Sequence, residues 1–209
     1  MKGKFITFEG GEGSGKSTQI KLLKQSLESQ GKTVLVTREP GGTPIGEKIR
    51  AILVGGNATI HPQTELLLFS ALRNEHMEIQ IKPALERGDW VLCDRFIDST
   101  TVYQGFGSGL NIRRIQWLHD FTLNTAKEHS PDLTFLLDID VEVGLKRSGR
   151  IDNTETRFES RGFEYHQKVR DGFLQLVKLY PRIKVIDALS DPDVVQEDIW
   201  NVLIRQLEL

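Results

Sequence analysis

The sequence predicts an α/β fold in which a parallel sheet of five strands is covered by helices on both faces. Short apolar segments rich in β-branched and aromatic residues recur along the chain, and segments with helical apolar spacing separate them. The short segments do not alternate polar with apolar residues, which indicates strands buried on both faces. The expected strands span 4–9, 32–37, 90–94, 132–140 and 182–188.

Helices are expected between these strands. The longest helical segment, 62–88, contains Pro83 near its end and is expected to form one helix. The last segment begins with residues that cap a helix. The expected helices span 15–30, 45–53, 62–88, 111–126 and 191–207. A later stretch, RSGRIDNTETRFESRG (147–162), is polar, rich in arginine and without an apolar stripe, so we expect it to be mobile.

The length of 209 residues allows one compact domain with a sizeable core, or at most two small ones, and we expect a single domain, 1–209. Apolar residues make up 38% and charged residues 27%, and the net charge of −2 gives no general attraction to nucleic acid or membrane. The single cysteine, Cys93, excludes an internal disulfide framework. No apolar run approaches the roughly 18 residues of a membrane helix. We therefore expect a cytoplasmic protein that binds neither nucleic acid nor membrane.

A glycine-rich loop lies between the first strand and the first helix. Gly10, Gly15, Lys16 and Ser17 fit the phosphate-binding pattern G-x-x-x-x-G-K-[ST], and a strand before and a helix after are the context that it requires. Its N–H groups and the helix N-terminus favour a nucleoside triphosphate, with Lys16 at the β/γ oxygens and Ser17 on Mg²⁺. The predicted ATP site is Gly10, Gly11, Glu12, Gly13, Ser14, Gly15, Lys16, Ser17 and Thr18.

Two further pairs of residues suit a nucleotide site. Asp94 and Arg95 end the third strand, where the acid suits Mg²⁺ or its waters and the arginine suits a phosphate, unless they form only a salt-bridged strand end. Phe69 and Arg73 are four residues apart and share a helix face. An aromatic ring beside a planar donor suits a pyrimidine, although Phe69 alone would more often be a core residue.

Four stretches, together with FEGGEGSGKST and in this order, closely resemble bacterial thymidylate kinases over essentially the whole chain. They are TREPGGT (37–43), LLLFSALRNEH (66–76), CDRFIDSTTVYQG (93–105) and the arginine-rich segment after GLKR (144–147). The resemblance implies a P-loop nucleoside monophosphate kinase-like fold with a mobile lid at about 147–162. It also implies transfer of the γ-phosphoryl group of ATP to dTMP with Mg²⁺, and a homodimer for which helix 62–87 is the candidate interface.

The resemblance implies roles for individual residues. Arg95 would bind the 5′-phosphate of dTMP, Phe69 and Arg73 would bind thymine, and Tyr103 would lie against the sugar and disfavour a ribose 2′-hydroxyl. Glu12 is expected to face the 3′-hydroxyl and metal waters, and Ser17 and Asp94 are the expected Mg²⁺ ligands, directly or through water. The predicted dTMP site is Glu12, Arg38, Arg50, Phe69, Arg73, Arg95, Ser99, Thr100, Tyr103 and Gln104.

A catalytic arginine is expected in the lid, because the phosphate-binding loop contains Glu12 and no arginine. Arg150, near the middle of the lid, is the first choice, and Arg147, directly after a helical segment, is the second. Arg157 follows Thr156, where relatives of this kind carry an acid. The predicted catalytic residues are Lys16, Arg95, Arg150 and Arg147.

Two alternatives to a dTMP kinase stay open. One is a kinase for another pyrimidine nucleotide, because these residues do not exclude dUMP. The other is a nucleotide-dependent switch without a small-molecule acceptor, since many classes of protein use the same loop.

Overall fold

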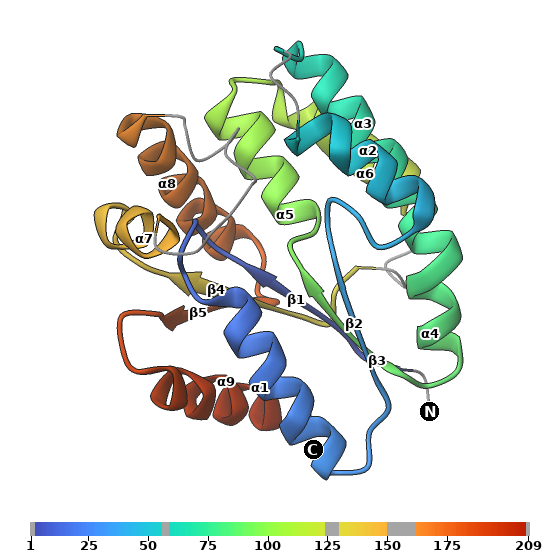
Figure 1. The fold of residues 1–209 in the computed structure, drawn as a ribbon, viewed down its shortest axis with the longest axis vertical. Helices are drawn as coiled ribbons and strands as arrows, with labels where there is room; N and C mark the ends of the chain where they lie inside the picture. Colours follow the sequence, from blue (N-terminus) through green and yellow to red (C-terminus); the bar gives the residue numbers. More distant parts are fainter. Residues whose placement is uncertain (1–2, 56–58, 124–129, 150–161, 208–209) are drawn as a thin grey trace.

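The computed structural model describes residues 3–55, 59–123, 130–149 and 162–207 (Figure 1). Within these residues, five strands form one parallel sheet in the order β2-β3-β1-β4-β5, which confirms the predicted fold class. The strands are β1 (Phe5–Glu9), β2 (Val34–Arg38), β3 (Trp90–Asp94), β4 (Leu133–Asp138) and β5 (Ile183–Asp187).

β1 lies at the centre of the sheet. Phe5 is paired with Val91 of β3, and Ile6 is paired with Leu133 of β4. From β1 the chain passes to β2 and β3 on one side and then to β4 and β5 on the other. Ligands of open α/β sheets bind beyond the carboxyl ends of the strands where the connections change direction. That point is the end of β1.

Two layers of helices cover the sheet, because successive strand residues face opposite sides. Ile6 and Phe8 pack in a core with residues of α1 (Lys16–Ser29) and α9 (Pro192–Leu207), and Phe5 packs in a second core on the other face. Figure 1 shows these two helices on the same side of the sheet. The helices are α1 (Lys16–Ser29), α2 (Pro44–Val54), α3 (Pro62–His76), α4 (Lys82–Glu86), α5 (Ile97–Thr100), α6 (Ile112–Thr122), α7 (Val141–Ser148), α8 (Phe163–Leu179) and α9 (Pro192–Leu207), with π-helical segments η1 (Met77–Ile81) and η2 (Thr101–Gly107).

The structure has one uninterrupted helical segment over 62–86, close to the predicted helix 62–88, but a π-helical turn lies inside it. α3 passes into η1, and α4 then begins just before Pro83. Proline donates no backbone hydrogen bond, and its ring crowds the carbonyl four residues earlier, so the regular α-helical pattern breaks in the preceding turn.

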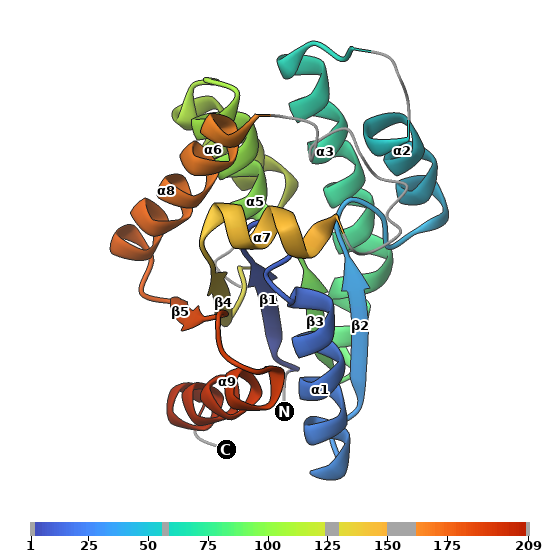
Figure 2. The same ribbon diagram turned by 60° about the vertical axis from the view of Figure 1, so that its left-hand side comes forward.

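α8 was not among the predicted helices, although Val169, Phe173 and Leu176 have helical spacing and are buried. The expected lid begins inside α7 and ends at Gly162, which caps α8. Residues 150–161 of that lid lie outside the described residues. Figure 2 shows α7 lying across the carboxyl ends of the strands. No helix in the described part of the chain is long and apolar enough to span a membrane.

Candidate active site

The glycine-rich segment turns tightly at the end of β1. Gly13 has a φ of 66°, and a Cβ there would lie 2.1 Å from the carbonyl oxygen of Gly144 in α7. A side chain is excluded at Gly13 by the backbone conformation and by this contact. Gly15, with a φ of 89°, caps α1, whose first turn is KSTQ. The N–H groups at this helix start favour an anion.

Lys16 begins α1, and its side chain folds back under the loop. Nζ donates to the carbonyl oxygens of Gly10 at 3.2 Å and Gly11 at 2.9 Å, and to Ser14 Oγ at 3.3 Å. Burial, together with the positive charge of Arg95, lowers the pKa of Lys16 below its ordinary value. A phosphate group in the loop would favour the charged form, so the lysine suits an anionic ligand.

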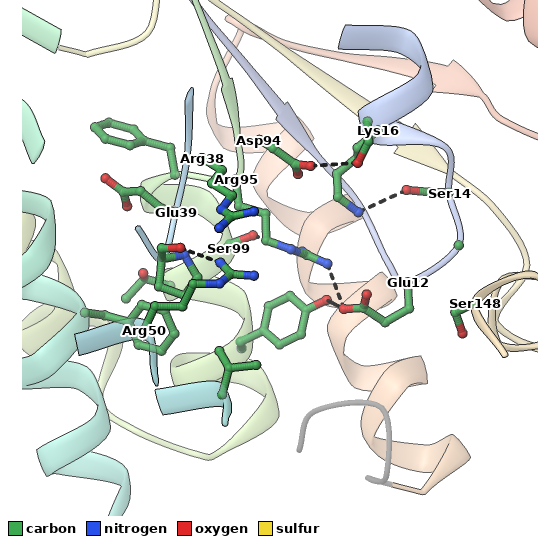
Figure 3. A pocket seen from close by; sticks show the side chains of 18 of the residues that line it. Glu12, Ser14, Lys16, Arg38, Glu39, Arg50, Asp94, Arg95, Ser99 and Ser148 are labelled. Atoms are coloured by element: carbon green, nitrogen blue, oxygen red, sulfur yellow. Dashed lines mark hydrogen bonds and ion pairs between the residues drawn. The ribbon is translucent and has the colours of Figure 1, made fainter. Parts of the chain in front are cut away.

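Asp94 ends β3 beside this loop. Its Oδ2 accepts a hydrogen bond from Ser17 Oγ at 3.2 Å, and its Oδ1 is buried without a partner among the described residues (Figure 3). A buried carboxylate oxygen without a partner is costly, and beside a hydroxyl it suits a hard divalent cation or its waters. Asp94 and Ser17 therefore fit Mg²⁺. In the described residues, no three or more His, Cys, Asp and Glu side chains form a further metal cluster.

Arg95 has a φ of 66°, which is uncommon for a residue other than glycine. Its Nη1 donates to the carbonyl oxygen of Gly10 at 3.0 Å, and its Nη2 donates to Glu12 Oε1 at 2.7 Å (Figure 3). Tyr103 donates its hydroxyl to the same Glu12 oxygen at 3.2 Å. Burial favours the neutral form of Glu12, but Arg95 and Lys16 outweigh it and lower the pKa of Glu12 below its ordinary value.

Glu9, at the end of β1, binds residues that follow Arg95 in the chain. Its Oε1 accepts from the Phe96 backbone N–H at 2.8 Å, and its Oε2 accepts from Ser99 Oγ at 2.5 Å. Burial, and then the negative charge of Asp98, raises the pKa of Glu9 to about 7. The sequence analysis did not place Glu9 in the site. Its position as the last residue of β1 could have indicated a site residue, because ligands bind at the carboxyl ends of such strands.

Phe69 and Arg73 both lie on α3 and line the same cavity, as predicted. Arg73 Nη2 donates to Thr100 Oγ1 at 2.8 Å, and Nε donates to Glu39 Oε2 at 2.8 Å. Arg73 Nη1 is buried and has no partner among the described residues. Arg73 therefore keeps a pair of N–H donors without a partner among the described residues, in a cavity that the Phe69 ring also lines, which suits a carbonyl on a planar base.

One cavity of about 390 Å³ joins the phosphate-binding loop to this region. All predicted dTMP-site residues line it, and so do the loop residues from Glu12 to Thr18. Gly10 and Gly11 instead line a smaller cavity of about 20 Å³ behind the loop. The dTMP-site residues that the cavity brings together are Glu12, Arg38, Arg50, Phe69, Arg73, Arg95, Ser99, Thr100, Tyr103 and Gln104.

Comparison with known proteins decides the family. A sequence model described as thymidylate kinase matches residues 8–199. The thymidylate kinase of Magnetococcus marinus is 50% identical to this chain, with 96% of this chain and 95% of that protein aligned.

The chain belongs to the thymidylate kinase family. The thymidylate kinase of Rhodopseudomonas palustris is 46% identical, with 100% of this chain and 92% of that protein aligned. The crystal structure of the thymidylate kinase from Ehrlichia chaffeensis matches with a TM-score of 0.80 and 35% identity, covering 97% of this chain and all of that one (100%). The resemblance seen in the sequence is thus confirmed.

Within this thymidylate kinase fold, several predicted residues also bind protein groups. Arg38 Nη2 lies 3.2 Å from Glu47 Oε2, and Arg50 Nη1 donates to the carbonyl oxygen of Pro40. Gln104 Nε2 donates to Glu65 Oε1 at 2.8 Å.

Arg147 is the one predicted lid arginine that lies within the described residues. Its Nη1 donates to the carbonyl oxygen of Ala188 at 2.9 Å, and its Nη2 donates to that of Leu189 at 3.2 Å. The guanidinium is therefore bound to the segment that follows β5. Arg150 and Arg157 lie outside the described residues, and their roles stay predictions.

Proposed function

We propose that the protein phosphorylates dTMP to dTDP with ATP as the phosphoryl donor, a step in dTTP synthesis. One observation carries the proposal: the phosphate-binding loop and the Phe69–Arg73 pair line a single cavity, so donor and acceptor can be held together. Membership of the thymidylate kinase family supports the choice of acceptor.

On the donor side, the loop from Gly10 to Thr18 would bind ATP, with Lys16 next to the transferring group. Ser17 and Asp94 would hold Mg²⁺, directly or through water, and the unpaired Oδ1 of Asp94 supports this assignment. When bound, the ion would neutralise charge on the phosphates.

On the acceptor side, Phe69 would stack on thymine, and the free Nη1 of Arg73 would donate to a carbonyl of the base. Arg95 would bind the 5′-phosphate, because its guanidinium stands between the loop and the acceptor region. Glu12 would face the 3′-hydroxyl, and Tyr103 would occupy the space that a ribose 2′-hydroxyl needs.

The reaction would be an in-line transfer between two anions. The acceptor phosphate oxygen is already ionised at neutral pH, so the protein needs no strong base and supplies position and positive charge. Lys16 and Arg95 provide part of that charge, and Arg150, or else Arg147, would complete it from the lid. Closure of the lid would exclude water and limit ATP hydrolysis.

We also propose a cytoplasmic homodimer. Large apolar side chains are exposed on α3 and on α6, which packs against it: Leu67 is 57% exposed, Trp117 64% and Phe121 67%. The rings of Trp117 and Phe121 stack with centroids 5.8 Å apart. An exposed apolar surface of this kind is typical of a protein interface.

A coupled assay of ADP formation tests the proposed activity with dTMP, dUMP, dGMP or no acceptor. We expect rapid ADP formation when dTMP is the acceptor, and slow ADP formation with dUMP, with dGMP or without an acceptor. Equal rates with dTMP and dUMP would favour a broader pyrimidine nucleotide kinase. Equal rates with and without an acceptor would favour a nucleotide-dependent switch.

A further inference from the structure

Behind the proposed base-binding arginine, Glu39 and His76 continue a buried chain of polar side chains. Glu39 lines the cavity beside Arg73, whereas His76 does not line it. Glu39 Oε2 accepts from Arg73 Nε at 2.8 Å, and Glu39 Oε1 lies 3.1 Å from His76 Nδ1. Arg73, Glu39 and His76 are 1%, 4% and 0% exposed. Because water does not reach them freely, each must obtain its hydrogen bonds from the others.

The His76 ring is held from both sides. Its Nε2 lies 2.7 Å from Thr37 Oγ1 on β2 and 3.1 Å from Gln80 Oε1 on η1. Gly42, with a φ of 85°, closes over the ring, and a Cβ at this position would lie 2.4 Å from His76 Nε2. The imidazole therefore has one orientation, with Nδ1 toward Glu39.

The direction of the hydrogen bond between His76 and Glu39 follows from the chemistry of the pair. Glu39 faces the Arg73 guanidinium as a carboxylate, which only accepts hydrogen bonds. The hydrogen in the Nδ1···Oε1 contact therefore comes from His76. This bond leaves Oε2 for Arg73 and fixes the plane of the carboxylate.

Arg73 is fixed in turn. Its Nε and Nη2 are both within hydrogen-bond distance of Glu39 Oε2, and Nη2 also donates to Thr100 Oγ1 at 2.8 Å. Nη1 alone has no partner among the described residues, and the Arg73 side chain lines the cavity. A guanidinium held at one side in this way presents a defined pair of donors at the other.

We infer that His76 and Glu39 are positioning residues for recognition of the acceptor base. The Nδ1–H group of His76 orients the Glu39 carboxylate, and the carboxylate orients Arg73 so that Nη1 meets a carbonyl edge. This inference rests on the proposed function and adds to it a histidine that contacts neither nucleotide. Because Nη1 only donates, the same arrangement disfavours a base with an amino group at that edge.

Two substitutions of His76 separate positioning from packing. In His76→Asn, the side-chain amide nitrogen takes the place of Nδ1 and keeps a donor for Glu39. In His76→Gln, the amide reaches the place of Nε2 near Thr37, and the donor to Glu39 is lost. We expect His76→Gln to raise the KM for dTMP about tenfold, with the KM for ATP and the kcat at saturating dTMP changed less than about twofold. His76→Asn should restore the KM for dTMP to within about threefold of wild type.

Base selectivity gives a second measurement. The ratio of kcat/KM for dTMP to kcat/KM for dCMP should fall in His76→Gln and in Glu39→Gln, because a loosened Arg73 can turn away from an amino group. Equal KM values for dTMP in the two His76 variants, or an equal rise in the KM for ATP, would overturn the inference.

If His76→Gln does not fold, Glu39→Gln tests the positioning role in its place. An unchanged KM for dTMP together with an unchanged selectivity ratio would overturn the inference in that case. Turnover of dTMP by the wild-type protein distinguishes the two proposals. Its absence contradicts the proposed function itself, whereas wild-type turnover with unaffected variants contradicts only the positioning role.

Discussion

Arg95 Nη2 lies 2.7 Å from Glu12 Oε1, so the arginine that follows β3 is paired with the acid inside the phosphate-binding loop. The two side chains are 17% and 21% exposed. An acceptor phosphate that binds Arg95 must therefore share this guanidinium with Glu12. The planar fork of arginine can serve two acceptors at once, which a lysine cannot do in the same geometry.

Replacing Arg95 by lysine should impair use of the acceptor far more than use of the donor. We expect kcat/KM for dTMP to fall about 100-fold and the KM for ATP to change less than about threefold, because the forked contacts are lost while the charge remains. Arg87→Lys is the control, since Arg87 is exposed and paired with Asp89. Similar losses in the two variants would argue against the role of Arg95.

Replacing Lys16 by methionine should separate catalysis from stability. Turnover should fall at least about 1,000-fold, because the lysine charge matters most in the transition state. The melting temperature of the protein without added nucleotide should change little, because methionine removes the three hydrogen bonds of Nζ to the loop but also removes a buried charge that Arg95 disfavours. Near-normal turnover would remove Lys16 from the mechanism.

The sequence predicted the fold and most of the residues that line the cavity, because the signals were local. The glycine loop is one continuous segment, and Asp94 and Arg95 follow from the end of a strand. Phe69 and Arg73 needed the family resemblance, since helical spacing alone does not show which face of α3 meets the cavity.

The supporting residues could not be predicted, because they depend on packing between distant segments. Glu39 and His76 are 37 positions apart in the sequence, and Glu9 binds a backbone group 87 positions away. The π-helical turns of η1 and η2 likewise break the regular spacing on which the helix predictions relied.

Glu9 should make stability depend on pH. Its pKa is raised from 4.5 to about 7, so its neutral form is favoured in the folded state. The stability that this contributes is fully present below pH 4.5 and is lost as the pH rises through about 7. The free energy of unfolding of wild type, relative to that of Glu9→Gln, should therefore decrease between pH 5 and pH 8. Urea unfolding at several pH values measures it, and parallel profiles would contradict the assignment.

The lid arginines give a test of transition-state stabilisation. Arg150→Ala should lower kcat by about 10³–10⁵-fold, as for arginines that stabilise a transferring phosphoryl group, and should change the KM for dTMP little. The Arg147 side chain is already bound to the carbonyls of Ala188 and Leu189, so we expect a smaller effect of Arg147→Ala. If Arg147→Ala, Arg150→Ala and Arg157→Ala all keep more than about a tenth of the wild-type kcat, the lid-arginine mechanism is wrong.

Direct transfer of the γ-phosphoryl group from ATP to dTMP is the central claim. It is tested by a single-turnover reaction with enzyme in excess, ATP labelled in the γ-phosphate, and dTMP. The expected result is label in the β-phosphate of dTDP, formed at the same rate as ADP and absent without dTMP. Label released as inorganic phosphate at equal rates with and without dTMP would contradict the claim.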